Sequence, residues 1–397
     1  MRAQPLDSKS SFFAVCLYFG INGLGMGAYA GSLPTLQERF GLAPWQLSSL
    51  FIVTGVGAIL AMQVDGRLAD KFGARRVSLA ALIPLIVGVA LVPLAPSYLW
   101  LLGAVFVFGV GNGGIDVTMN VLAVHVEKAR PRPVMSFFHG MWAFGNMLGA
   151  GAIAAVASLF ALDGVATMHV VLLGVCAIAI GVLAAAWALI PETEAVAQVG
   201  ETGEKAKLPK VAYLLGLMAI AFGFGEGTGM DWSAIHVTEV AKVDPTVGAL
   251  GVTVLAGFIT LIRITADRLV MRIGRRAVVR YGGMVACAGY LIVAVATPLP
   301  LLLAGWALVG LGMGVVAPQV YGAAGHIAGG RGLAVVVTFG YVTFLASPAV
   351  MGGLVTALGV QRTMFFPAVL LVALVALSRV LPRKEDDPSV ISGGGID

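Results

Sequence analysis

The sequence GVGNGGIDVTMN, residues 109–120, lies inside a long apolar run that begins at Leu99. In an α-helix it places Asn112, Asp116 and Asn120 on one face, because residues four apart lie above one another. The glycines beside this polar stripe allow a neighbouring helix to approach closely. A carboxylate in a membrane helix is costly unless it faces a cavity or a partner. The stretch therefore predicts a functional acid at Asp116, with a structural hydrogen bond between helices as the alternative.

The composition is that of a polytopic helical membrane protein. Of 397 residues, 59% are hydrophobic and 11% are charged, and the mean hydropathy is +0.95. Twelve apolar runs are long enough to cross about 30 Å of hydrocarbon as helices. They cover residues 12–36, 45–64, 77–95, 98–124, 134–160, 165–190, 211–238, 246–265, 277–297, 300–325, 332–358 and 361–381. We therefore expect an all-α fold of twelve transmembrane helices, with no soluble catalytic domain.

The distribution of positive charge predicts the orientation. If the N-terminus is cytoplasmic, only Arg39, Lys242 and Arg362 lie outside, and every other lysine and arginine lies inside. We expect a multi-pass protein of the inner membrane with both termini in the cytoplasm. Basic loops that face anionic headgroups account for the net charge of +5, so no nucleic-acid partner is needed.

The sequence gives no sign of an enzyme or a metalloprotein. The three cysteines are isolated in apolar segments, which favours buried side chains over disulfides or a metal site. The hydrolase pattern Gly-x-Ser-x-Gly and the metalloprotease pattern His-Glu-x-x-His do not occur. We therefore expect a protein without enzymatic activity that needs no cofactor.

An internal repeat divides the chain into two halves. The longest polar segment lies at its midpoint and has the composition of a flexible linker. A shift of 201 residues places three glycines of the first half on glycines of the second: Gly109, Gly111 and Gly113 fall on Gly310, Gly312 and Gly314. The expected parts are a six-helix bundle at 1–190, a linker at 191–210, a second bundle at 211–382 and a disordered polar tail at 383–397.

Repeats of this kind are typical of secondary transporters, in which the solute lies near the midplane between the halves and the halves rock against each other. The shift also shows where the halves differ. Asp116 falls on Ala317, and Glu226 falls on Gly25. Each acid therefore belongs to one half only, which favours a role in chemistry over a role in the shared scaffold.

Helix one of the first half is polar for a membrane span. Asn22 and Tyr29 are seven residues apart and share a face, where they could bond a polar solute or a neighbouring helix. Helix five also carries polar residues on one face: His139, Trp142 and Asn146 follow at spacings of three and four. The imidazole of His139 could relay a proton, or it could bond a helix carbonyl.

Helix seven contains GFGEGTGMDWS, residues 223–233. Its dense glycines predict that this helix, like helix one, is bent or broken, which is a pointer to a binding site. Glu226 is expected near the midplane, with Asp231 further outward as a second acid or as a cap of the break. Trp232 is either a binding residue or an interfacial anchor, and His236 is expected at the outer rim. Helix ten is expected to end near Pro318. Gln319 at that end and Tyr341 on helix eleven are possible cavity residues.

The loop after helix two reads GRLADKFGARR, residues 66–76. It resembles the loop signature of the major facilitator superfamily: the matching residues are Gly66, Asp70, Gly73, Arg75 and Arg76. The resemblance implies that the aspartate and arginines form a latch with helix ends across the cytoplasmic gap. The alternative is that the arginines only reflect the general excess of positive charge in cytoplasmic loops. The glycines are expected to permit a tight turn.

The second copy of this loop is degenerate, with Met271 where Asp70 would map. It retains Asp267 and Arg268. Arg263, four residues before Asp267, could pair with it on the same helix face.

The resemblance covers about residues 12–381, and finer features are similar to a bacterial subgroup akin to fucose permeases. In that subgroup an acid on helix four is implied in proton coupling, and Asp116 holds this position. We expect a monomeric proton-coupled importer of a small polar solute, with Asp116, Glu226, His139 and Asp231 as the coupling residues. Proton-driven efflux is the alternative, although helix five lacks the Gly-Pro pattern of antiporters.

Overall fold

The computed structural model describes residues 6, 8–130, 134–189 and 210–386. Every regular element in these ranges is a helix. Within them, twelve helical stretches are long and apolar enough to cross a membrane. The predicted all-α fold with twelve spans is therefore confirmed. Of the predicted linker, only Lys210 is described, as the first residue of a helix.

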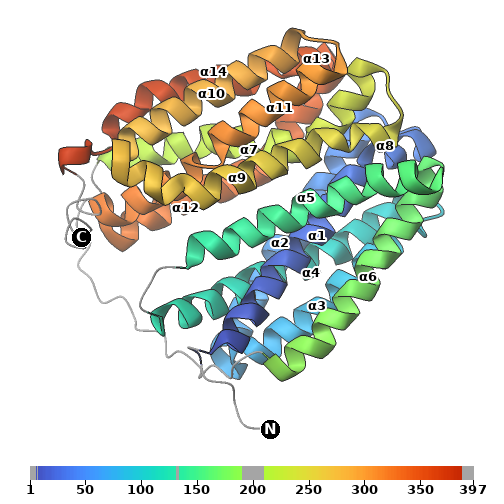
Figure 1. Cartoon of the computed structure of the whole chain (residues 1–397), viewed down its shortest axis with the longest axis horizontal. Helices are drawn as coiled ribbons and strands as arrows, with labels where there is room; N and C mark the ends of the chain where they lie inside the picture. Colours follow the sequence, from blue (N-terminus) through green and yellow to red (C-terminus); the bar gives the residue numbers. More distant parts are fainter. Residues whose placement is uncertain (1–5, 7, 131–133, 190–209, 387–397) are drawn as a thin grey trace. The chain divides into compact units, whose positions relative to one another are not determined.

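The chain forms two compact units (Figure 1). The first comprises Met1–Thr202 with Val243–Thr253, and the second comprises Gly203–Lys242 with Val254–Asp397. The short segment Val243–Thr253 therefore belongs to the first unit, although the sequence placed it in the second bundle. The helices of the first half are α1 (Lys9–Phe40), α2 (Pro44–Phe72), α3 (Ala74–Leu91), α4 (Tyr98–Lys128), α5 (Met135–Phe160) and α6 (Gly164–Leu189).

The second half is more interrupted, because several of its spans are assembled from two helices. Pro245–Ala266, Leu299–Ala324 and Val360–Val380 are each one span but more than one helix. The elements are α7 (Lys210–Ala241), α8 (Pro245–Gly248), α9 (Leu250–Ile273), α10 (Arg275–Val295), α11 (Leu299–Met313), α12 (Val316–Leu358), α13 (Val360–Thr363), α14 (Phe365–Leu377) and the 3-10 turns η1 (Ser378–Val380) and η2 (Lys384–Asp386).

Helix α4 is packed between α2 and α3 by its glycines. A methyl group built on Gly109 would lie 2.1 Å from the carbonyl oxygen of Thr54 on α2, and one on Gly111 would lie 2.1 Å from the amide nitrogen of Leu85 on α3. No side chain fits at such distances, so the helices touch backbone to backbone. The stretch 109–120 therefore holds three helices of the first half together.

The second half repeats these contacts at positions shifted by 201. A methyl group on Gly310 would lie 2.4 Å from the carbonyl oxygen of Leu255, and one on Gly312 would lie 2.5 Å from the amide nitrogen of Ala286. Both the glycines and their partners are the shifted equivalents of the residues that pack α4. The sequence repeat is thus a repeat of helix contacts within each half.

The same repeat appears in the loop after helix two. Gly73 joins α2 to α3 with φ 84°, and Gly274 joins α9 to α10 with φ 82°. These left-handed backbone angles require glycine, and they explain the second glycine of the signature. The first one is different: Gly66 lies inside α2. The prediction that both glycines form the turn was therefore wrong for Gly66.

Helices one and seven were predicted to be bent or broken; α1 and α7 run without interruption, so the prediction of a break was wrong. The glycines of α1 serve a contact instead. Methyl groups on Gly23 and Gly27 would lie 2.0 and 1.9 Å from the carbonyl oxygens of Trp142 and Asn146 on α5. Glycine in a membrane helix is equally suited to a break and to a close contact, and here α1 uses the contact.

The interruption of span ten lies at Gly314 and Val315, between α11 and α12, rather than near Pro318. Pro318 is the third residue of α12. A proline in the first turn removes no helical hydrogen bond, because the N–H groups there have no partner within the helix. Pro318 therefore stands near the start of a helix, and the prediction that helix ten ends there was wrong.

The first residues of the predicted tail are folded. Lys384–Asp386 forms η2, and the Lys384 Nζ donates to the carbonyl oxygen of Arg272 at 2.9 Å. Arg276 Nε donates to the carbonyl oxygen of Leu381 at 2.6 Å. These bonds tie Leu381 to α10 and Lys384 to the end of α9, so the expectation of disorder was wrong for Lys384–Asp386.

The repeated contacts make a stability prediction. We expect Gly113→Ala and Gly314→Ala each to lower the free energy of unfolding by about 1–3 kcal/mol, since overpacking displaces backbone. The added methyl group would lie 2.3 Å from the carbonyl oxygen of Ala58 in the first case and 2.5 Å from Ile262 in the second. Thermal unfolding of the purified protein in detergent measures the effect.

Gly103→Ala is the matched control on α4, because nothing lies within 4 Å of the added methyl group. It should leave the midpoint unchanged or raise it slightly. Equal midpoints for all three variants would contradict the packing account.

Candidate functional site

The polar stripe of α4 is half-buried within the first half, at Asn112, Asp116 and Asn120. Asn120 Nδ2 donates to the backbone carbonyl of Asp116 at 2.8 Å, so its amide satisfies its own helix. Among the described residues, no hydrogen bond or ion pair reaches the carboxylate of Asp116. The structure therefore leaves this membrane acid without a partner in its own half.

Asn22 on α1 connects the stripe to a third helix. Its Nδ2 donates to the backbone carbonyl of Asn112 on α4 at 3.2 Å, and its Oδ1 accepts from Trp142 Nε1 on α5 at 2.8 Å. Only 1% of Asn22 is exposed. We call Asn22, Asn112 and Trp142 the amide bridge. The sequence predicted that Asn22 bonds either a solute or a neighbouring helix, and the structure shows the bond to neighbouring helices.

Three other predicted residues of the first half lie in its interior. Tyr29 is buried with its ring 5.3 Å from that of Phe108, and Asn146 is also buried. His139 is half-buried and lies edge-on to Phe19, with ring centroids 5.2 Å apart.

Two amide oxygens in this interior have no partner. The Oδ1 atoms of Asn112 and Asn146 are buried without a hydrogen bond among the described residues. Buried polar atoms are nearly always paired, so two orphaned acceptors in one bundle suggest an occupant that donates to them.

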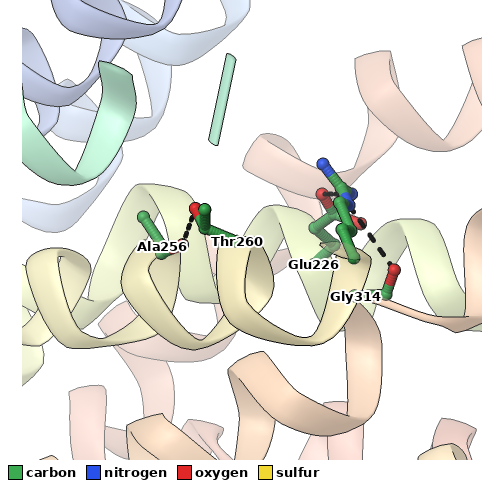
Figure 2. Close-up of polar contacts among 5 residues, drawn as sticks. Glu226, Ala256, Thr260 and Gly314 are labelled. Carbon is green, nitrogen blue, oxygen red and sulfur yellow. Dashed lines mark hydrogen bonds and ion pairs between the residues drawn. The ribbon is translucent and has the colours of Figure 1, made fainter. Parts of the chain in front are cut away.

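The second half holds a half-buried ion pair (Figure 2). Glu226 Oε1 of α7 lies 3.1 Å from Arg263 Nη2 of α9, and the side chains are 20% and 11% exposed. Arg263 Nε also donates to the carbonyl oxygen of Gly314 at 3.4 Å, at the interruption of span ten. The sequence offered Asp267 as a partner of Arg263, and that pairing stays a prediction; the structure adds Glu226 as a partner. The side chain of Asp267 lies outside the described residues.

The C-terminal part of α7 is buried more deeply than predicted. Asp231 is half-buried, and Trp232 is 1% exposed, which argues against an interfacial anchor. His236 was expected at the outer rim, but it is fully buried. Its Nε2 donates to the carbonyl oxygen of Val293 at 3.1 Å, and its ring lies edge-on to Trp306. A ring beside a carbonyl and an indole is shielded from water, which the position near a helix end did not reveal.

Sequence reasoning missed two polar residues. Tyr290 of α10 donates its hydroxyl to the carbonyl oxygen of Gly225, next to Glu226. Asp65 of α2 is half-buried, and its Oδ2 would lie 2.1 Å from a methyl group on Gly114, beside the α4 stripe. A signal for Asp65 existed: the shift of 201 places it on Ala266, so it is another acid that only one half carries.

The remaining predicted residues are less informative. Ser78 Oγ donates to the backbone carbonyl of Arg75, which is half-buried, whereas Arg76 and Arg268 are exposed. Gln319 is buried on α12. The side chains of Asp70 and Tyr341 lie outside the described residues. The latch and the central cavity therefore stay predictions.

Comparison with known proteins identifies the family of the fold. The model of the Major Facilitator Superfamily matches residues 15–270. An uncharacterised transporter of Sinorhizobium fredii is 35% identical over 364 residues, which are 90% of this chain and 94% of that protein.

Two solved structures share the fold at low identity. The nucleoside transporter NupG superposes with a TM-score of 0.75 at 12% identity and covers 94% of this chain and 100% of its own. The fucose:proton symporter FucP of E. coli has a TM-score of 0.61 at 17% identity and covers 93% of this chain and 97% of its own. At these identities the likeness concerns the fold alone.

The amide bridge predicts an energetic coupling between α1 and α5. In a double-mutant cycle of Asn22→Leu and Trp142→Phe, we expect a coupling of about 0.6 kcal/mol and at most about 1.7, as found for hydrogen bonds between membrane helices. The measurement is reversible unfolding in mixed micelles. A cycle of Asn22→Leu with Trp100→Phe, at an exposed position near the start of α4, should show additive effects. Additivity in both cycles would contradict the bridge.

Proposed function

Because the chain belongs to the Major Facilitator Superfamily and is a membrane transporter, we propose that it imports a small polar solute by proton-coupled alternating access. The proposal places it in the inner membrane with both termini in the cytoplasm. Asp116 and Glu226 are the acids proposed to bind and release the coupled proton.

One observation carries the proposal: the carboxylate of Asp116 is half-buried in a membrane span without a partner among the described residues. A lone charge at such a position costs several kcal/mol, and a charge that no partner offsets marks an ion or proton pathway. The scaffold does not require it, since the repeat has Ala317 at the equivalent position. Asp116 costs folding free energy and the scaffold does not need it, so a role in proton transfer explains it best.

The polar solute is supported by the orphaned amide oxygens of Asn112 and Asn146. An oxygen acceptor in a bundle interior is satisfied by a hydroxyl or N–H donor, which sugars and similar metabolites supply. The fold neighbour named as a fucose:proton symporter agrees with import of such a solute together with a proton. Likeness of fold does not identify the solute, so we propose a small polar solute and not fucose itself.

We expect Asp116→Asn to abolish accumulation of solute against its gradient, since a neutral amide cannot exchange a proton. Purified protein is first screened by thermal shift against sugars and small metabolites. Uptake of a stabilising solute is then measured in proteoliposomes with an imposed pH gradient, inside alkaline. The variant should still equilibrate the solute across the membrane while failing to concentrate it.

Asp163→Asn is the matched control, because Asp163 caps the start of α6 through the amide of Ala166 at 2.7 Å, and an asparagine caps equally well. This variant should concentrate solute like the natural protein. If Asp116→Asn also concentrates it, the coupled proton is carried elsewhere. Accumulation driven only by an inside-acid gradient would favour proton-driven efflux instead.

A further inference from the structure

The ion pair of Glu226 and Arg263 is an addition to the scaffold. Under the shift of 201, its members fall on Gly25 and Met62, and Gly314 falls on Gly113. The glycine contact itself occurs in both halves: a methyl group built on Gly113 would lie 2.3 Å from the carbonyl oxygen of Ala58, and one built on Gly314 would lie 3.1 Å from that of Ile259, the shifted equivalent of Ala58. The first half therefore builds the same helix contact without any charge.

A buried ion pair is a poor way to stabilise a membrane bundle. Removing two charges from water costs several kcal/mol per ion, and their attraction often only balances that cost. An apolar pair such as the first half uses would fold at least as well. The pair therefore calls for a functional reason beyond holding α7 to α9.

Arg263 has unused binding capacity. A guanidinium group has five N–H donors in a planar fork. Among the described residues, only two contacts use that fork: one to Glu226 and a long one to the carbonyl of Gly314. The side chain is 11% exposed, so it is desolvated but reachable. A desolvated guanidinium with free donors is suited to a carboxylate, which it binds through two parallel hydrogen bonds.

Charge balance then couples the anion to a proton. The pair is neutral, so an anion alone would leave the site with one uncompensated negative charge, and a proton alone would leave Arg263 unpaired. When both bind together, Glu226 is protonated, Arg263 faces the anion and the site is neutral again. Since a lone buried charge is costly, the two ligands bind as a unit. One acid contacts Arg263, which matches a solute with one negative charge rather than a phosphate ester with nearly two.

We propose, as a refinement that rests on the proposed function, that the solute is a monocarboxylate bound by Arg263 and that Glu226 takes up one proton as it binds. No bond in the solute changes: Glu226 gains a proton from the buffered solution, and Arg263 exchanges its bond with Glu226 for one with the solute.

The other ionisable groups near Glu226 are few. Tyr290 of α10 donates its hydroxyl to Gly225, and Asp231 and His236 lie further along α7. Helices α11 and α14 contain no ionisable residue, and α13 contributes Arg362. On α12, the ring of Tyr321 lies edge-on to Phe222 of α7, and the side chains of His326, Arg331 and Tyr341 lie outside the described residues. Arg263 is thus the one described arginine that contacts Glu226.

The test compares carboxylates with neutral molecules of similar size. Thermal unfolding of the purified full-length protein is measured with lactate and lactamide, benzoate and benzamide, and gluconate and glucose. At least one carboxylate should stabilise the protein more than its neutral counterpart. Calorimetric titration of that carboxylate in two buffers of different ionisation enthalpy should then show about one proton taken up per anion bound, as neutrality requires.

Variants separate binding from structure. Glu226→Gln should bind the carboxylate at least as tightly with no proton uptake, because the competing charge is gone. Arg263→Gln and Arg263→Lys should bind it about tenfold more weakly or worse, because both lose the bidentate fork. Arg39→Gln is the matched control: Arg39 donates to the carbonyl oxygens of Pro93 and Ala95, and its loss should not change carboxylate binding.

The refinement is overturned if no carboxylate stabilises the protein more than its neutral counterpart, or if Glu226→Gln leaves proton uptake unchanged. It is also overturned if Arg263→Lys, checked for folding by gel filtration, binds the carboxylate normally. These results are distinct from failure of the proposed function. Gradient-driven uptake of a neutral sugar would support proton-coupled transport and refute the anion, whereas carboxylate binding without accumulation would do the reverse.

Discussion

Direct contact between helix backbones is the constraint on which the rest of the structure depends. Gly109 and Gly111 bring α4 against α2 and α3, and Gly310 and Gly312 make the equivalent contacts in the second half. In lipid there is little hydrophobic drive between helices, so close approach and van der Waals contact supply the cohesion. The scaffold of each half is therefore fixed by glycines at matching positions, and polar residues are free to differ.

The polar residues differ in a consistent way. Among the described residues, Asp65 and Asp116 of the first half and Asp231 of the second have no partner, whereas Glu226 is paired with Arg263. Both arrangements are expensive in a low-dielectric interior, and none of these acids is repeated in the other half. Each half has the same scaffold without the other half's charges. The scaffold therefore does not need these charges, and we attribute their presence to chemistry. This asymmetry is the physical basis for assigning transport roles to side chains rather than to the fold.

Much of the fold could be predicted because it depends on local pattern. Apolar run length gave the spans, and the repeat gave the equivalent glycines. Some residues could not be placed from the sequence because their type serves two purposes. The glycines of α1 allow a break or a contact, and the position of α5, at Trp142 and Asn146, decides for the contact. Arg263 has an acid four residues away in sequence, but its described partner is on another helix. Neighbouring helices decide such cases, and the spacing of residues along one helix does not show which helices are neighbours.

The central claim is that unmatched membrane acids change protonation. Infrared spectroscopy of the protein in lipid measures this directly, through the carbonyl stretch of a protonated carboxyl group as the pH is stepped. The account predicts a band that changes with pH in the natural protein and is weakened when Asp116→Asn and Glu226→Gln are combined, while Asp65 and Asp231 remain. The same band, unchanged in the double variant, would contradict it.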